Sequence, residues 1–267
     1  MDFWKGESTG LLKALHILTA DGKLNADSRR KLKQVYHLTQ LIEPLIERIE
    51  SKNPDFKIVD MGAGKSYLGF ILYDLILRRS GQGQIVSIES RPELIERSKQ
   101  LALDSGFDRM SFLPSSIQDA KLNGSVDLVC ALHACDTATD DAILFGIKHE
   151  AKAFALVPCC QAEVARSLES VKETSANRAL YDFPIHRREF GSHLTNVIRS
   201  LFLQSQGYKV TATELVGWEH SMKNELILAE KISSPEHPKS KEARETLRAL
   251  LEQFPVKMSL FTGQTII

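Results

Sequence analysis

Aspartate and glycine residues follow a short apolar run early in the chain, at a spacing that suits ligand binding. Residues 56–66 read FKIVDMGAGKS, which predicts a buried strand that ends in Asp60-x-Gly62-x-Gly64, followed by a helix. Glycines at such a strand-to-helix turn allow the backbone to approach a ligand closely. We therefore expect Asp60, Gly62 and Gly64 to bind a ligand.

The same turn departs from two common phosphate-binding motifs. The sequence G-x-x-x-x-G-K-[ST] needs a glycine where the chain has Val59, and G-x-G-x-x-G needs one where it has Tyr67. Asp60 would also repel a pyrophosphate, whereas a carboxylate favours a ligand that carries an ammonium group. S-adenosylmethionine carries such a group, so an aspartate before the glycines suits this ligand.

The ends of two further predicted strands extend the expected cofactor site. Glu89 closes the second predicted strand, 29 residues after Asp60. An acid at that place in doubly wound folds accepts hydrogen bonds from ribose hydroxyls. Ser116 and Ile117 follow the third predicted strand, where an adenine pocket is expected, although a capped loop would explain the same residues.

Histidine, cysteine and acidic residues follow the fourth and fifth predicted strands. His133, Cys135 and Asp136 leave the fourth strand, and Cys159 and Cys160 leave the fifth. Ligands in parallel sheets bind beyond the carboxyl ends of the strands. These side chains are therefore expected to gather beside the cofactor.

Three kinds of chemistry fit this set of side chains. His133 titrates near neutral pH and, oriented by Asp136, would take a proton from a hydroxyl acceptor during in-line methyl transfer. Cys159 or Cys160 would instead add as a thiolate to a pyrimidine ring. A metal site has less support, because its ligands would come from two loops. The non-catalytic alternatives are a His133 that contacts the cofactor and cysteines that fill the core.

Hydrophobic patterning predicts the elements that hold these residues. Short apolar runs alternate with amphipathic stretches, which is typical of an α/β fold with a doubly wound, mostly parallel seven-stranded sheet. Strands are predicted over residues 56–61, 84–89, 110–113, 126–132, 153–157, 208–215 and 225–230. Helices are predicted over 8–20, 26–51, 66–79, 92–105, 137–149, 162–172, 194–206 and 236–253, with a long loop over 173–191. The expected domains are a helical extension (1–53), a cofactor-binding domain (54–231) and a C-terminal helix and tail (232–267).

Composition excludes several classes of protein. With 43% apolar and 25% charged residues, the 267-residue chain is neither collagen-like nor wholly disordered. Lysine plus arginine and aspartate plus glutamate each total 34, so an overall basic surface is disfavoured. The four cysteines all lie between Cys130 and Cys160, which does not suit a disulfide framework. With no leader-like or membrane-spanning stretch, the expectation is a cytoplasmic protein.

The ordered set of motifs resembles the class I S-adenosylmethionine-dependent methyltransferases over roughly residues 55–231. The segments ALHACDTATD (131–140) and VPCCQ (157–161) are similar to a subfamily related to tRNA 2′-O-methyltransferases. The chain departs from that pattern at Asp136, where the family has glycine, and at Gln161, where it has histidine. The resemblance implies S-adenosyl-L-methionine as cofactor, an RNA substrate, and a cofactor site made of Asp60, Gly62, Gly64, Glu89, Ser116, Ile117, Leu132 and His133.

Two basic clusters are candidates for contact with RNA phosphates. Residues 29–33 read RRKLK, and Arg178, His186, Arg187, Arg188, His193, Asn196 and Arg199 form the second cluster. A solvated charged surface would explain either cluster alone. The zero net charge leaves a small molecule or a protein as alternative substrates. A non-catalytic cofactor-binding module is the alternative from a different class.

Overall fold

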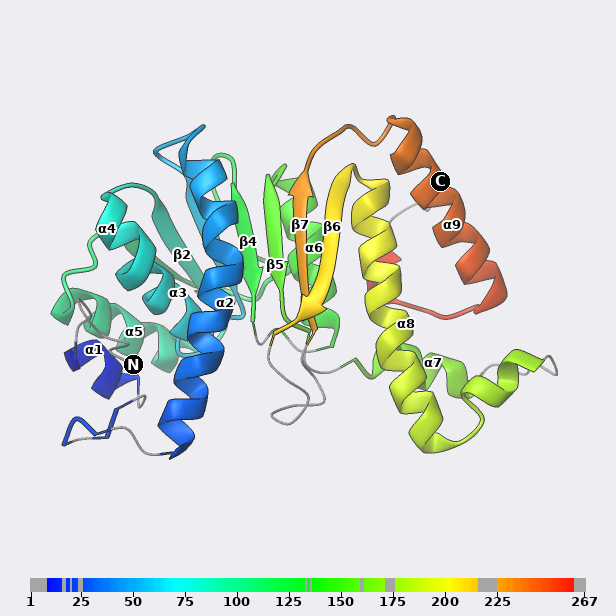
Figure 1. Cartoon of the computed structure of the whole chain (residues 1–267), viewed down its shortest axis with the longest axis horizontal. Coiled ribbons are helices and arrows are strands. Elements are labelled where there is room, and N and C mark those ends of the chain that lie inside the picture. The colour runs from blue at the N-terminus through cyan, green and yellow to red at the C-terminus, as the bar shows by residue number, and fades with distance from the viewer. Residues whose placement is uncertain are drawn as a thin grey trace.

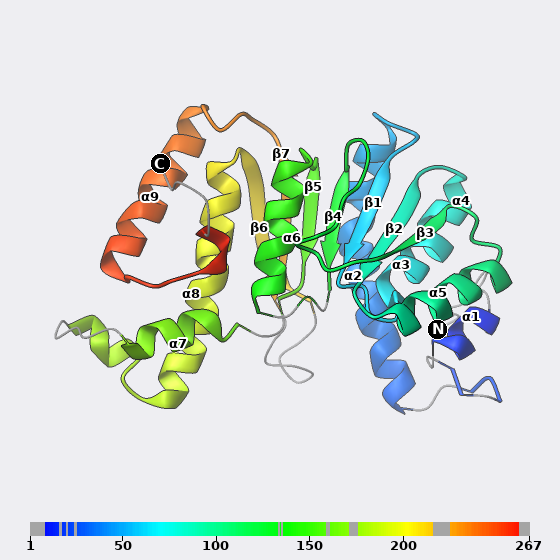
Figure 2. The same cartoon turned by 180° about the vertical axis from the view of Figure 1, so that it is seen from behind.

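The chain folds around one twisted sheet that has helices on both faces (Figures 1 and 2). The computed structural model describes residues 9–15, 18–19, 21–23, 26–132, 134, 136–158, 161–170, 176–215 and 225–261, with Thr9 and residues 26–35 in backbone only. The strands are β1 (Lys57–Met61), β2 (Gln84–Glu89), β3 (Met110–Pro114), β4 (Leu128–Ala131), β5 (Ala153–Leu156), β6 (Tyr208–Glu214) and β7 (Glu225–Lys231). Their order is β3-β2-β1-β4-β5-β7-β6, and β7 alone runs in the direction opposite to the other strands. The predicted fold class is confirmed.

Helices cover the sheet in two layers. They are α1 (Thr9–Ala14), α2 (Ala26–Glu50), α3 (Tyr67–Leu72), α4 (Arg78–Ser80), α5 (Pro92–Asp104), α6 (Thr137–Lys148), α7 (Glu163–Ser170), α8 (Pro184–Ser205) and α9 (Pro238–Gln253). A π-helical turn, η1 (Tyr73–Leu77), joins α3 to α4, and the 3₁₀ turns are η2 (Ala176–Leu180) and η3 (Ser259–Phe261). Since strand side chains alternate between faces, Ile58 packs towards α2 and α3, whereas Val59 packs in the core that holds α6 and α8.

The carboxyl ends of β1 to β5 lie together at the lower edge of the sheet in Figure 1. The first turns of α2 and the η2–α8 segment both extend past this edge, one on each side of the molecule (Figures 1 and 2). The two basic regions of the sequence therefore lie at the same edge as the Gly62–Gly64 turn.

The helix that follows β5 differs from the sequence prediction. Residues 173–191 were expected to form a loop, but α8 begins at Pro184, ten residues before the predicted start at 194. Proline at the first helical position and the extended backbone of Phe183 define this start. The first two turns carry exposed side chains, so they lack the apolar periodicity on which the prediction rested. Helix α2, in contrast, continues through Pro44 without interruption.

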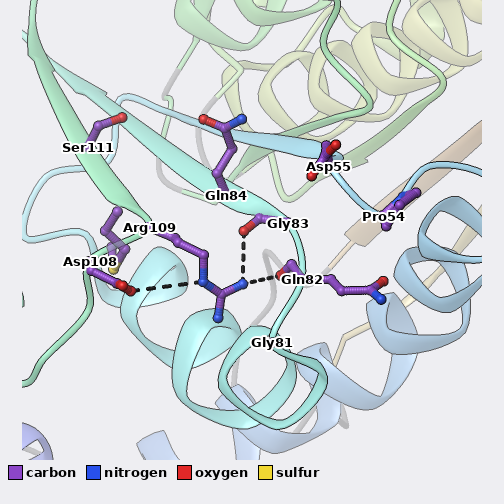
Figure 3. Close-up of a pocket in the computed structure, with 10 residues that line it drawn as sticks. Pro54, Asp55, Gly81, Gln82, Gly83, Gln84, Asp108, Arg109 and Ser111 are labelled. Carbon is purple, nitrogen blue, oxygen red and sulfur yellow. Dashed lines mark hydrogen bonds and ion pairs between the residues drawn. The ribbon is translucent and has the colours of Figure 1, made fainter.

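The opposite edge of the sheet carries a pocket between the starts of β2 and β3 (Figure 3). The Arg109 guanidinium there donates hydrogen bonds to the backbone carbonyls of Leu77, Gln82 and Gly83, so it closes the end of α4. The guanidinium carbon also lies 5.2 Å from the centre of the Tyr73 ring. The Arg109 guanidinium therefore binds backbone carbonyls around the end of α4, which gives it a structural role rather than a role in ligand binding.

Two glycines in the connection between α4 and β2 provide a matched test of packing. Gly81 and Gly83 both have a positive φ, at 74° and 70°. A Cβ at Gly83 would lie 2.4 Å from Cζ of the buried Phe56, whereas a Cβ at Gly81 meets nothing within 4 Å. We expect Gly81→Ala to lower the free energy of unfolding by about 1 kcal/mol through backbone strain, and Gly83→Ala by roughly 2–4 kcal/mol. Urea denaturation of both variants measures the difference, and equal losses would contradict the packing at Phe56.

Candidate functional site

A row of polar side chains crosses three neighbouring strands beneath helix α3. Asp60 of β1 pairs in register with Ser87 of β2 and Cys130 of β4, so the three side chains share one face. Asp60 is 2% exposed, and its Oδ2 accepts no hydrogen bond from any described residue. Burial raises the pKa of Asp60 to about 7, and the backbone N–H of Gly69 offsets part of the shift. An unsatisfied buried carboxylate is costly, so this oxygen is poised for a missing partner.

The turn after β1 uses left-handed backbone at alternate residues. Gly62, Gly64 and Ser66 have φ values of 64°, 58° and 55°. A hydrogen bond from the Ala63 N–H to the Ile88 carbonyl anchors the turn to β2. Both glycines thus have the conformation that glycine adopts without strain, which explains their place in the motif.

Side chains from two other loops form walls around this turn. A Cβ placed at Gly62 would lie 3.6 Å from Ala134 and 3.7 Å from Ile117. Ile117 is partly exposed, as is Leu132 at the end of β4. The Ser116 hydroxyl stabilises the local turn, because it donates to Asp119 at 2.7 Å and accepts from the Asp119 N–H at 3.1 Å. Ile117 is therefore the clearer of the two predicted adenine-side residues.

Glu89 ends β2 at the same edge and is 5% exposed. Its Oε2 accepts from the Gly64 N–H at 2.8 Å, and its Oε1 accepts from the Arg91 N–H at 3.0 Å. The Arg91 side chain adds Nε to Oε1 at 2.9 Å and Nη2 to Oε2 at 3.2 Å. Burial alone would raise the pKa of Glu89, but these donors outweigh it and lower the pKa to about 2. The carboxylate is therefore ionised throughout the neutral pH range.

These residues fit the expected cofactor in charge and in shape. The buried Oδ2 of Asp60, which accepts no hydrogen bond from the described residues, suits the ammonium group of S-adenosylmethionine, and the glycine turn lets the backbone lie close to its methionine portion. The ionised Glu89 suits the ribose hydroxyls, and the apolar wall of Ile117 suits the adenine. When bound, this cofactor supplies an electrophilic methyl group.

The loop after β4 is fixed to the start of α7 by Asp136. This residue has a positive φ of 53°, and its Oδ1 accepts from the N–H groups of Ala162 and Glu163 at 2.9 and 3.1 Å. Its Oδ2 forms an ion pair with Arg166 at 3.0 Å. Burial alone would raise the pKa of Asp136, but these contacts together lower it. His133, Cys135, Cys159 and Cys160 lie outside the described residues.

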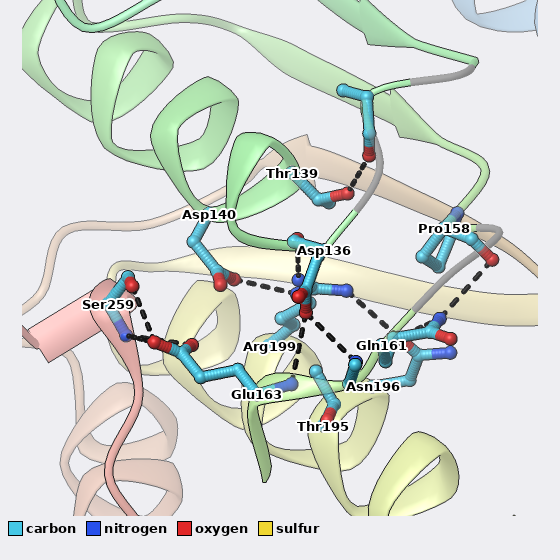
Figure 4. A network of polar contacts seen from close by, with 12 residues as sticks. Asp136, Thr139, Asp140, Pro158, Gln161, Glu163, Thr195, Asn196, Arg199 and Ser259 are labelled. Atoms are coloured by element: carbon cyan, nitrogen blue, oxygen red, sulfur yellow. Dashed lines mark hydrogen bonds and ion pairs between the residues drawn. The ribbon is translucent and has the colours of Figure 1, made fainter. Parts of the chain in front are cut away.

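Helix α8 carries a polar network that joins this loop to two others (Figure 4). Arg199 and Asp140 are both 1% exposed and are joined by Nε–Oδ1 contact at 2.7 Å. Arg199 Nη2 also donates to the Asp136 carbonyl at 2.7 Å. Asn196 Oδ1 accepts from Gln161 Nε2 at 3.2 Å, in the loop after β5. Arg199 and Asn196 were expected in a surface cluster for phosphates, and that expectation is wrong because both are buried.

The same network reaches the final strand pair. Asn196 Nδ2 donates to Glu225 at the start of β7 at 2.7 Å, and Ser192 donates to Gln161 at 2.8 Å. Gln161 also donates to the Pro158 carbonyl at the end of β5. One face of α8 therefore holds together the segments that follow β4 and β5 and the first residue of β7. The sequence analysis did not predict this role. The signal that could have indicated it is Arg199, a cation at a position on the apolar face of a helix.

Comparison with family models identifies the protein family. A model described as a methyltransferase domain matches residues 30–167, just over half of the chain. The chain belongs to this methyltransferase family. The expected S-adenosylmethionine-dependent methyltransferase is confirmed, and the cofactor expectation with it. Comparison with curated proteins gives no match.

Solved structures similar to the methyltransferase share its fold at low sequence identity. Magnesium protoporphyrin IX methyltransferase from Synechocystis, solved with S-adenosylhomocysteine, is 12% identical with a TM-score of 0.50, over 85% of this chain and 96% of that one. A Podospora anserina methyltransferase is 12% identical (TM-score 0.45; 78% and 83% covered). An rRNA methylase from Streptococcus thermophilus is 11% identical (TM-score 0.44; 67% and 89% covered). The first of these supports the fold.

Three arginines of the methyltransferase near the start of α8 form ion pairs with nearby carboxylates. Arg178 pairs with Asp182 at 3.1 Å, Arg187 with Glu169 at 3.0 Å, and Arg188 with Glu189 at 2.9 Å. His186 and His193 are exposed on the same helix. The second basic cluster is thus weaker in net charge than its sequence suggests.

Two further searches cover only the part of the methyltransferase that the structure describes. In it, none of the helices has both the length and the apolar character needed to cross a membrane. The same residues contain no group of three or more histidine, cysteine, aspartate or glutamate side chains placed to hold a metal ion.

Proposed function

We propose that this methyltransferase acts on RNA, with tRNA or rRNA as the substrate. The observation that supports RNA most directly is the position of the two basic regions. The first turns of α2, with the sequence RRKLK at 29–33, and the exposed start of α8 flank the edge that holds the Gly62–Gly64 turn (Figure 1). Cations on both sides of a methyl-transfer edge would contact the phosphates that adjoin an acceptor nucleotide.

The segments LHACDTATD and PCCQ support a place in the subfamily related to tRNA 2′-O-methyltransferases. In this proposal His133 takes the proton of the acceptor hydroxyl. Asp136 acts through position, because its carboxylate already holds the start of α7 and binds Arg166. A thiolate of Cys159 or Cys160 is the alternative for methylation of a pyrimidine carbon.

A label-transfer experiment tests the substrate class. Purified protein and S-adenosylmethionine with a labelled methyl group are added to RNA, protein and small-molecule fractions from cells that lack this protein. We expect label in RNA, and nucleoside mass spectrometry then separates ribose from base methylation. His133→Ala is expected to keep cofactor binding and lose most transfer if His133 is the base, whereas Cys159→Ala and Cys160→Ala report on the thiolate route. Label confined to another fraction would contradict the RNA proposal.

A small molecule or a protein is the second candidate substrate. It is favoured by the zero net charge and by the ion pairs that occupy Arg178, Arg187 and Arg188. The cofactor edge would be unchanged in this case, and the fractionation experiment separates the two candidates directly.

A further inference from the structure

The carboxylate expected to bind the cofactor ribose is already fully occupied by the chain itself. Glu89 accepts five hydrogen bonds, from the Gly64 and Arg91 N–H groups, from Ser90 Oγ at 3.3 Å, and from two nitrogens of the Arg91 side chain. An ionised carboxylate offers about four lone-pair positions. No acceptor position on Glu89 is left for a ribose hydroxyl.

The Arg91 side chain reproduces the pattern of a vicinal diol. Nε binds Oε1 at 2.9 Å and Nη2 binds Oε2 at 3.2 Å, so one donor meets each carboxylate oxygen. Two neighbouring ribose hydroxyls would place one donor on each oxygen in the same way. Arg91 Nη2 also lies 3.8 Å from the Cβ position of Gly64, over the turn that the cofactor must approach. The guanidinium and the ribose therefore compete for one place.

Of the five donors, the Ser90 hydroxyl and the two nitrogens of the Arg91 side chain belong to exposed side chains and are able to leave, and only the Arg91 nitrogens meet both carboxylate oxygens. The Gly64 and Arg91 N–H groups are fixed, because the turn is anchored to β2 and the Arg91 carbonyl accepts from Leu94 and Ile95 at the start of α5. The Arg91 side chain is 58% exposed. Glu93 lies close enough to favour its positive charge, so an anion remains nearby when the pair with Glu89 opens.

We propose that Arg91 closes the ribose-binding carboxylate of the free enzyme and is displaced from Glu89 when the cofactor binds. Arg91 then lowers cofactor affinity, because its ion pair with Glu89 has to open before the ribose binds. The inference rests on the proposed use of Glu89 for ribose, and it assigns Arg91 a role that the cofactor motif does not contain.

Calorimetric titration of purified protein with S-adenosylhomocysteine tests the proposal, at a mildly alkaline pH that keeps Glu89 ionised in every variant. We expect Arg91→Gln to bind about three- to tenfold more tightly than the wild type, because no ion pair has to open. Wild-type binding should also tighten as salt weakens the pair, whereas Arg91→Gln should respond less. Arg48→Gln is the matched control, since Arg48 makes the same two-nitrogen pair with Glu230 on another surface. Its affinity should equal that of the wild type.

Equal binding by a folded Arg91→Gln would overturn the proposal, because Arg91 would then not compete with the ribose, and weaker binding would overturn it because Arg91 would then support the ribose site. Arg91→Lys provides a second variant if Arg91→Gln is unstable, since a lysine cannot pair with both oxygens at once and should bind with an intermediate gain. Absence of binding by wild type and variants alike would instead contradict the cofactor assignment itself. Thermal unfolding of each variant establishes that it is folded.

Discussion

Replacement of Asp60 by asparagine is expected to stabilise the free protein and to weaken cofactor binding at least tenfold. The carboxylate is buried with one oxygen unpartnered, and burial raises its pKa from 3.8 to about 7. A shift of about three pKa units corresponds to roughly 4 kcal/mol of unfavourable ionisation, as an upper bound. The amide in the Asp60→Asn variant carries no charge, so part of this cost disappears, while the attraction to an ammonium group disappears as well.

The sign of the pH dependence follows from the raised pKa. Folded Asp60 holds its proton to higher pH than the unfolded residue, so the free energy of unfolding falls as pH rises from about 4 to about 7. Cofactor binding should change in the opposite direction and tighten as pH rises through about 7, because the ionised form binds the ammonium. Asp60→Asn should show neither trend. Thermal unfolding and titration with S-adenosylhomocysteine over this pH range measure both.

Asp127 supplies the control for Asp60. It is also buried, at the opposite edge of the sheet, but its carboxylate accepts from the Lys57 N–H at 2.9 Å and from Asn53. Asp127→Asn should leave the protein no more stable and should leave cofactor affinity unchanged. An Asp60→Asn variant that is less stable than the wild type at mildly alkaline pH, or that keeps full affinity, would contradict the assignment.

The sheet and the cofactor turn were predictable because their signals are local. Strands β4 and β5 are buried throughout and read as continuous apolar runs, and the inner positions of β1 and β2 are apolar except for Asp60 and Ser87. The position of Glu89 beside the glycine turn was predictable from its distance along the chain from Asp60 and its place at the end of a strand. The contact of Arg91 with Glu89 was not predictable, because the sequence Glu-Ser-Arg does not determine whether the arginine side chain folds back onto the carboxylate.

The polar network of α8 was not predictable for a related reason. Asn196 and Arg199 lie among charged residues in the sequence, which favours a surface cluster. In the helix they share a buried face with Leu194, Ile198 and Phe202. Their partners, Asp140 and Gln161, are 59 and 35 residues away along the chain. Contacts of that separation depend on the packing of α6 and α8 and leave no mark on local periodicity.

Arg199 is expected to be the most costly single side chain to remove. It is a fully buried cation that pairs with Asp140 and donates to the Asp136 carbonyl and, at 3.4 Å, to Asn196 Oδ1. Burial raises the pKa of Asp140, and Arg199 opposes the rise, so the loss of Arg199 leaves an uncompensated buried carboxyl group. We expect Arg199→Met to lower the free energy of unfolding by about 3–5 kcal/mol in urea denaturation.

A double-mutant cycle separates the charge from the packing of Arg199. Adding Asp140→Asn to Arg199→Met should restore part of the loss, since the unpaired carboxylate is then absent. Arg199→Lys keeps the charge but cannot reach three acceptors from one rigid fork, so an intermediate loss is expected and the variant should still fold. Arg48→Met removes the exposed pair with Glu230 and should cost less than about 1 kcal/mol. A loss that small for Arg199→Met would contradict the buried pair.

The same substitution should act on the segments that Arg199 joins. The Asp136 carbonyl loses a donor in Arg199→Met, while the Asp136 carboxylate still caps α7 through Ala162 and Glu163. Hydrogen exchange should therefore rise in peptides that cover 136–140 and 161–166, and remain unchanged around the Gly62–Gly64 turn. Since the turn and Glu89 lie on other strands, S-adenosylhomocysteine should still bind a folded Arg199→Lys variant with wild-type affinity. Retained cofactor binding with a lower rate of methyl transfer would assign the α8 network to positioning of the acceptor side, whereas loss of cofactor binding would show that the network supports the whole edge.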